Sequence, residues 1–247
     1  MFRLILCFLV LLIAFVLTII AFPLSRLIFL FNKRAGDVFS LKFVMAVFKA
    51  LLFVSGVKVT VKGRENLPEP DEGVVYISNH LGIFDVVSLY PLLPGRAGFI
   101  AKKEIKTWPL IGWWLIVLNC LFLDRQNTRN ALKTILKGIE NVENGISMVI
   151  FPEGTRSRVD GDLLPFHDGS FKLATKPKAR IIPVAITNSA AVFENHLPWI
   201  KSAEIVIEFL KPIETASLSR DELKALPSSV HDLIQERVRA NHPKGTK

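Results

Sequence analysis

Residues 74–85 read VVYISNHLGIFD, in which an apolar strand-like run passes directly into a helix-like one. Val74–Ser78 is a strand candidate, and a helix candidate over Phe84–Leu92 follows it after a polar turn. The same order of strand and helix recurs along the rest of the chain. Alternation of this kind predicts an α/β domain with a largely parallel central sheet covered by helices.

The remaining elements continue this pattern from residue 57 onward. Ser219-x-x-Glu222 has the spacing of a capping box and predicts a C-terminal helix after it. We therefore assign residues 56–247 to one α/β domain and residues 1–55 to a separate N-terminal region. The other predicted helices cover residues 108–115 and 128–142, and the other predicted strands cover residues 57–62, 98–101, 118–124, 147–151, 181–187 and 204–210.

The N-terminal region begins with a long apolar segment, residues 4–31. Leu4–Phe22 contains no charged residue and is 19 residues long, close to the roughly 20 that a helix needs to cross a bilayer. A cleavable signal peptide is a poor alternative, because its apolar part is shorter and a small-x-small cleavage site would follow it. The segment therefore predicts a membrane anchor. Pro23 interrupts it, which favours a helical hairpin within one leaflet over a single crossing.

Residues 38–54 have apolar side chains at helical spacing beside basic residues such as Lys42 and Lys49. This pattern predicts an amphipathic helix at the lipid interface, and the alternative is that its apolar face packs on the domain core. Lys33 and Arg34 also follow the apolar segment directly. By the positive-inside tendency, we expect the domain after the anchor on the cytoplasmic face of the membrane.

The chain is both apolar and basic. It has 31 Lys and Arg against 22 Asp and Glu, a net charge of +9, and 50% of its 247 residues are hydrophobic. An anionic membrane surface and nucleic acid both fit this balance. Because no nucleic-acid motif is present, we expect membrane lipid as a partner and no nucleic acid. Cys7 and Cys120 lie in apolar runs, where neither a disulfide nor a nucleophile is expected.

The polar turn after Val74–Ser78 carries His80 and Asp85. Side chains five residues apart do not share a face of one helix, but they meet if His80 lies in the turn and Asp85 reaches back from the first helical turn. The carboxylate then fixes the imidazole tautomer and leaves the second ring nitrogen free as a general base. The alternative is a histidine that caps or packs at the strand end.

Basic residues follow two other strand candidates. Phe151-Pro152-Glu153-Gly154-Thr155-Arg156-Ser157-Arg158 comes after one strand, and Arg125 comes after another. Arg156 and Arg158 can grip a phosphate, and Arg125 can converge on the same anion. The alternatives are an ion pair between Arg156 and Glu153 that holds the turn, and a solvated Arg158.

Several other kinds of site are not indicated by the sequence. It contains no G-x-S-x-G elbow, no phosphate-binding loop of the G-x-x-x-x-G-K-[ST] kind, and no metal-ligand spacing among its five histidines. We therefore expect no metal and no cofactor. A base at His80 without a nucleophile on the protein would activate a hydroxyl of the substrate.

These motifs, in this order and spacing, resemble those of the PlsC-type glycerolipid acyltransferases. The likeness rests on Asn79-His80-x4-Asp85, Leu123-Asp124-Arg125, Phe151-Pro152-Glu153-Gly154-Thr155-Arg156 and Ile182-Pro183-Val184, and it extends from about residue 55 to 215. The chain departs from the family at Leu81-Gly82, where members often have polar residues such as Gln-Ser.

The resemblance implies transfer of a fatty acyl group from acyl-CoA or acyl carrier protein to the sn-2 hydroxyl of lysophosphatidic acid. His80 would be the general base and Asp85 would orient it. Arg125, Arg156 and Arg158 would hold the substrate phosphate. Glu153, Gly154 and Thr155 would position the substrate. The alternatives are another acceptor, such as glycerol 3-phosphate or a different lysophospholipid, a thioesterase or lipase, and a membrane-tethered module that binds nucleic acid. No oligomeric state is indicated.

Overall fold

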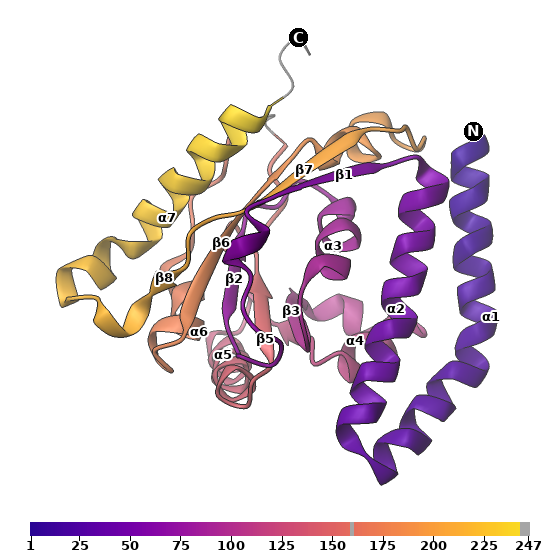
Figure 1. Cartoon of the computed structure of the whole chain (residues 1–247), viewed down its shortest axis with the longest axis horizontal. Coiled ribbons are helices and arrows are strands. Elements are labelled where there is room, and N and C mark those ends of the chain that lie inside the picture. The colour runs from indigo at the N-terminus through magenta and orange to yellow at the C-terminus, as the bar shows by residue number, and fades with distance from the viewer. Residues whose placement is uncertain (159–160, 243–247) are drawn as a thin grey trace.

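The computed structural model describes residues 1–158 and 161–242 and contains a helical hairpin packed against an α/β domain (Figure 1). The hairpin consists of α1 (Phe2–Phe31) and α2 (Lys33–Ser55). The helices of the domain are α3 (Ile83–Leu89), α4 (Ile111–Val117), α5 (Thr128–Glu143), α6 (Lys172–Thr175) and α7 (Arg220–Asn241). Its strands are β1 (Lys58–Lys62), β2 (Val75–Ser78), β3 (Ala97–Lys102), β4 (Leu121–Leu123), β5 (Ser147–Ile150), β6 (Arg180–Thr187), β7 (Glu204–Phe209) and β8 (Ile213–Glu214).

The strands form one sheet in the order β1-β7-β6-β2-β5-β3-β4, with β8 beside β6. The five strands from β6 to β4 are parallel to one another. β7 and β8 each pair antiparallel with β6, and β1 pairs parallel with β7, so β1 also runs opposite to the five parallel strands. The prediction of an α/β fold with a largely parallel sheet is therefore confirmed.

Helices cover both faces of the sheet, so the central strands are buried on both sides. On β2, Tyr76 packs in a core shared with α2 and α3, whereas Val75 and Ile77 pack in a second core with α5, α6 and α7. All three side chains have no exposed surface. This alternation is the two-residue period of a strand, and it explains why the run at 74–78 is apolar throughout.

Six of the predicted strands lie within one residue of the observed ends, and the capping box of α7 is present. The strand predicted at 118–124 is shorter, because Leu118 still belongs to the end of α4 and Asn119 has a positive φ of 59°. The helix predicted from residue 108 starts at Ile111, since Leu110 has a φ of 61° that no α-helix accommodates. The short strand β8 was not predicted.

The break predicted at Pro23 was wrong, because α1 continues through this proline. An internal proline removes one backbone hydrogen bond and bends a helix, and Figure 1 shows α1 bending before its end. Contacts from α4 hold the helix just before this point: the Trp114 indole N–H donates to Thr18 Oγ1 over 3.0 Å. The chain turns instead at Asn32, whose side chain accepts the Ala35 N–H and caps α2.

The helix predicted at 38–54 is part of α2, which lies between α1 and the domain (Figure 1). Its apolar side chains pack on the core, as the alternative interpretation expected, and Leu51 is buried there. At its first turn, Arg34 forms an ion pair of 2.8 Å with Asp71 of the domain. The domain therefore lies against α2 from its first turn to its last.

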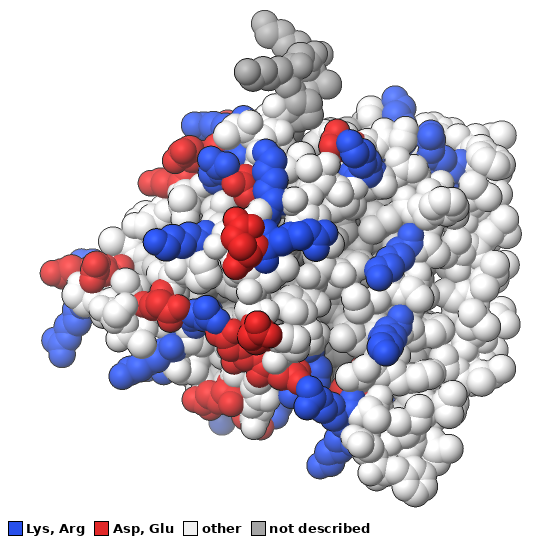
Figure 2. Space-filling view, in the orientation of Figure 1, with Lys and Arg blue, Asp and Glu red and all other residues white. Residues whose placement is uncertain are grey.

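The outer helix α1 leaves most of its apolar side chains exposed. Figure 2 shows the surface over the hairpin as almost entirely uncharged, with a few separate basic side chains. In the described residues, α1 and α2 are the two helices that are long and apolar enough to cross a membrane, judged by length and composition.

Candidate active site

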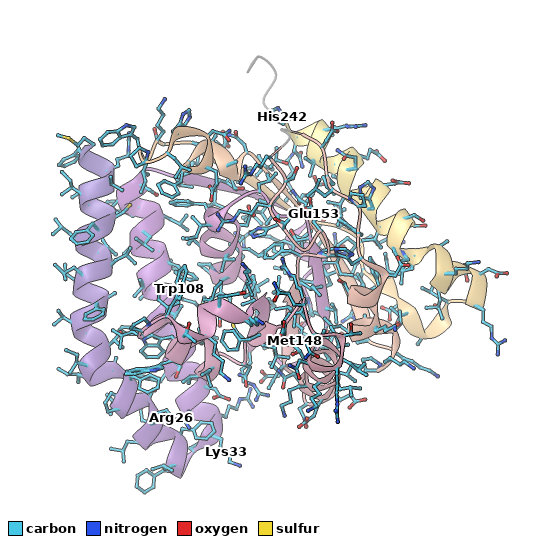
Figure 3. All side chains as sticks on the ribbon, turned by 180° about the vertical axis from the view of Figure 1, so that it is seen from behind. Arg26, Lys33, Trp108, Met148, Glu153 and His242 are labelled. Carbon is cyan, nitrogen blue, oxygen red and sulfur yellow. The ribbon has the colours of Figure 1, made fainter. Side chains whose placement is uncertain are left out.

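The candidate residues come together at one edge of the sheet. His80 follows β2, Arg125 follows β4, and Glu153 follows β5. Since these strands are parallel, their carboxyl ends meet at the same edge, where ligands bind in open α/β sheets. Figure 3 shows Glu153 at this end of the domain, away from the hairpin turn marked by Arg26 and Lys33.

His80 and Asp85 form the hydrogen-bonded pair that the spacing predicted. His80 Nδ1 lies 2.6 Å from Asp85 Oδ2, and the carboxyl group is fully buried. The same oxygen accepts the N–H groups of Leu81 (2.7 Å) and Gly82 (2.8 Å), and Oδ1 accepts the hydroxyl of Ser189. A carboxylate in this position favours the tautomer with hydrogen on Nδ1, which leaves Nε2 as the basic nitrogen.

Three further contacts hold the His80 turn in place. The Asn79 side chain accepts the Ile186 N–H and donates to the Ile186 carbonyl, both over 2.8 Å, which ties the turn to β6. The His80 ring stacks on Phe151, with 4.2 Å between ring centroids and 16° between planes. The Ser157 N–H donates to the His80 carbonyl. The imidazole is thus fixed in orientation while 19% of its side chain stays exposed.

Glu153 organises the backbone around the pair. Its two carboxyl oxygens accept the N–H groups of His80 (2.7 Å) and Leu164 (2.8 Å). Burial raises the pKa of Glu153, and these two backbone hydrogen bonds partly offset the rise. The alternative ion pair between Glu153 and Arg156 does not occur in the part of the chain that the structure describes.

Arg156 instead pairs with Glu194, over 3.4 Å from Nη1 to Oε1. The same carboxyl oxygen accepts the Ile83 N–H at the start of α3 (2.8 Å). Glu194 therefore connects this arginine to the helix that carries Asp85. About half of the Arg156 side chain is exposed (49%), which leaves its guanidinium accessible from solvent.

Arg125 and His167 lie beside Gly154. A Cβ atom built on this glycine would be 3.1 Å from His167 Nε2 and 4.0 Å from the Arg125 guanidinium carbon. Gly154 also has a φ of 71°, in the region that favours glycine. The structure thus brings Arg125 to the loop that carries Arg156. Thr155 and Arg158 are exposed on this loop.

The sequence did not point to Ser189 or Glu194. Ser189 directly follows the β6 strand and Asn188, so the rule that polar residues after parallel strands form sites could have identified it. Glu194 carries no such signal, because it lies beyond the strand end, at the start of a short 3-10 helix over Glu194–His196.

The N–H groups of Leu81, Gly82 and Ile83 at the start of α3 donate to Asp85 and Glu194, so these three are already used and do not point into the site as oxyanion donors. Among the described residues, no group of three His, Cys, Asp or Glu side chains could hold a metal ion.

Comparisons with known proteins agree on one family. The sequence model of a family described as "Acyltransferase" matches residues 58–187. A 1-acyl-sn-glycerol-3-phosphate acyltransferase from Borreliella burgdorferi is 30% identical over 200 residues, which are 80% of this chain and 79% of the relative. A protein of the same name from Saccharomyces cerevisiae is 32% identical over 186 residues, covering 74% of this chain and 61% of its own length.

A relative of that name from Cocos nucifera is also matched over 61% of its length, so the chain spans about three fifths of these two curated relatives. Among solved structures, the crystal structure of the 1-acyl-sn-glycerophosphate acyltransferase PlsC from Thermotoga maritima has a similar fold. Its TM-score is 0.77 at 24% identity, over 96% of this chain and 97% of that one.

Proposed function

Because the chain belongs to the acyltransferase family, we propose that it transfers a fatty acyl group to the sn-2 hydroxyl of 1-acyl-sn-glycerol 3-phosphate, which gives phosphatidic acid. The observation that carries this proposal is the His80–Asp85 pair, with Arg125 and Arg156 at the same edge of the sheet. The names of the relatives agree with this acceptor.

In the proposed reaction, His80 Nε2 takes the proton of the acceptor hydroxyl as its oxygen attacks the thioester carbonyl. A C–O bond forms and the C–S bond breaks without an acyl-enzyme intermediate. The proton on Nε2 then passes to the departing thiolate, so the donor leaves as a free thiol. Asp85 stabilises the imidazolium that exists between these two transfers.

The arginines bind the acceptor phosphate in this mechanism. Arg156 presents a half-exposed guanidinium, and Arg125 lies beside the same loop. A phosphate held by charge-assisted hydrogen bonds fixes the hydroxyl against His80, which lowers the entropic part of the barrier. Arg158 lies exposed two residues further on and would extend this cationic surface. Glu153 positions the loop through its backbone contacts with His80 and Leu164.

The hairpin is proposed to lie along one leaflet, with the domain on the cytoplasmic face. Arg34 pairs with the domain at the start of α2, and β1 begins just after its end. If α2 crossed the bilayer, the polar domain beside it would be immersed in hydrocarbon. In the flat orientation, the exposed apolar surface of α1 faces lipid, so reacting acyl chains need not enter water, where each CH₂ costs about 0.8 kcal/mol.

The test is a matrix of two donors and three acceptors with the protein in lipid-detergent micelles. Acyl-CoA and acyl carrier protein are each combined with lysophosphatidic acid, glycerol 3-phosphate or lysophosphatidylcholine, and thiol release and the lipid product are measured. We expect phosphatidic acid from lysophosphatidic acid, and a preference for another acceptor would replace this assignment with that acceptor. The matrix also identifies the donor.

Two histidine variants provide the control. His80→Ala removes the proposed base and is expected to abolish turnover. His231→Ala is matched to it, because His231 also contacts a carboxylate, Asp232, over 2.9 Å, but lies on α7. Turnover in His80→Ala equal to that in His231→Ala would refute the proposed mechanism.

A further inference from the structure

An open groove of about 600 Å³ lies between the hairpin turn and α4. Arg96, one of its lining residues, directly precedes β3, so the groove is at the amino end of the parallel strands. His80 lies at the carboxyl end, and the six residues of β3 span about 20 Å. Figure 3 shows Arg26 and Lys33 at this end of the molecule. The groove is therefore separate from the candidate active site.

The groove is lined by more basic than acidic side chains. Arg96 is paired, with Asp71 at 3.1 Å and Asp37 at 3.8 Å. Arg26, Lys33 and the acid Asp37 also line the groove; Asp37 interacts electrostatically with Arg26, but neither Arg26 nor Lys33 lies within ion-pair distance of an acid in the described part of the chain. Lys33 is the first residue of α2, where the helix dipole adds positive potential. The residues that line the groove therefore include three basic side chains against one acid, Asp37, so the groove keeps a net positive charge that attracts an anion.

The walls of the same groove are apolar. Phe22 and Phe29 of α1 form one side, and Trp113 and Ile116 of α4 form the other. Trp113 and Ile116 are each 51% exposed, and they adjoin the exposed apolar surface of α1 through the contact of Phe22 with Trp113. The Arg26 guanidinium lies 4.3 Å from the Phe29 ring centroid. A ligand that fits this lining has an anionic head and an apolar body.

We propose that this groove binds the headgroup of an anionic glycerophospholipid from the surrounding leaflet. The lipid phosphate would contact Arg26 and Lys33, and the upper parts of its acyl chains would lie against Phe22 and Trp113. The volume falls in the usual range of small-molecule sites. Because Arg26 and Lys33 are positively charged, we expect an anionic lipid to bind more tightly than a zwitterionic one. Because the groove adjoins the exposed apolar surface of α1, we expect a lipid to bind more tightly than a free anion. This inference does not depend on the proposed acyl transfer.

The test is thermal unfolding of the full chain in zwitterionic detergent, with short-chain phosphatidylglycerol added in increasing amounts. Short-chain phosphatidylcholine and inorganic phosphate are the comparison ligands. We expect a saturable rise in Tm with phosphatidylglycerol only. In Arg26→Gln/Lys33→Gln the apparent affinity is expected to fall about 30-fold, which corresponds to about 2 kcal/mol.

Charge-matched variants separate the groove from general attraction to the surface. Lys42→Gln/Lys49→Gln removes the same charge from exposed positions of α2 outside the groove, and it is expected to keep the response of the unmodified protein. If the groove variant fails to fold, Lys33→Gln alone is expected to lower the affinity about fivefold.

Four outcomes would overturn the proposal. They are an equal response to phosphatidylcholine, an equal response to inorganic phosphate, an unchanged response in the groove variant, and an equal loss in Lys42→Gln/Lys49→Gln. A positive result with no acyl transfer would leave the lipid site standing and refute only the proposed enzymatic function.

Discussion

Replacing Asp85 with asparagine separates the hydrogen bonds of the carboxylate from its charge. Oδ2 accepts three donors, from His80, Leu81 and Gly82, whereas within residues 1–158 and 161–242 Oδ1 accepts the hydroxyl of Ser189 alone. An amide oxygen in the place of Oδ2 keeps all three contacts. The amide nitrogen in the place of Oδ1 can donate to the Ser189 oxygen, because a hydroxyl also accepts. Asp85→Asn is therefore expected to fold and to keep the His80 tautomer.

The loss of charge is expected to appear in the rate. With the imidazolium and carboxylate charges about 4 Å apart and an effective dielectric constant of about 20, their attraction is about 4 kcal/mol. Losing it lowers kcat by up to about 10³-fold. The hydrogen bonds that remain limit the change in Tm to about 4 °C, which corresponds to about 1 kcal/mol in a domain of this size.

Thiol release under saturating donor and acceptor, together with melting followed by circular dichroism, measures both quantities. The turnover of His80→Ala gives the residual activity without the proposed base, with which the turnover of Asp85→Asn is compared. Turnover of Asp85→Asn like that of the unmodified protein would refute the role of the carboxylate in stabilising an imidazolium. A variant that does not fold would refute the assignment of donors and acceptors around Asp85.

Three other predictions concern the surroundings of this pair. Ser189→Ala leaves Oδ1 of the buried Asp85 without its donor, and we expect a loss of about 2 kcal/mol in denaturant unfolding; a loss near zero would contradict this hydrogen bond. Burial raises the pKa of Glu153 above its ordinary 4.5, so its contribution to stability is present below that value and is lost as the pH rises through the raised pKa. Unfolding free energies measured across this range are expected to fall less steeply in Glu153→Gln, and an unchanged slope would contradict the direction of the shift. Gly154→Ala places a Cβ at positive φ and 3.1 Å from His167, so we expect a loss of about 1–2 kcal/mol by the same unfolding measurement, and an unchanged stability would contradict the strain.

The parts of the site that lie close together in sequence were predictable. His80 and Asp85 are five residues apart at a junction of strand and helix, so local geometry alone brings them into contact. The partners of this junction from elsewhere in the chain were not predictable. Ser189 and Glu194 reach it across 104 and 111 residues, because β6 is the neighbour of β2 in the sheet. The hydrophobic periodicity of a single strand does not predict which strands will be its neighbours in the sheet.

Some predicted boundaries of helices and strands were wrong, and each of these errors has a local cause. The continuous apolar run around Leu118 cannot distinguish the end of a buried helix from the start of a buried strand. A proline inside a helix tends to end it, but α1 continues through Pro23, because contacts with α4 stabilise the helix there. The sequence of α2 does not show whether its apolar side faces lipid or the domain core. In the structure α1 occupies the outer position, and the apolar side of α2 packs on the core.

Asn79 has a consequence for how the active pair withstands motion. Its side chain bonds both the N–H and the carbonyl of Ile186, which two backbone residues of a longer β2 would otherwise bond in a parallel ladder. The main chain can therefore leave the sheet at His80 without losing its registration to β6. Ser189, three residues beyond Ile186, holds Asp85 from the same strand end. The turn that carries His80 and the side chain of Asp85 are therefore both tied to the end of β6. A small shift of β6 would move the imidazole and the carboxylate together.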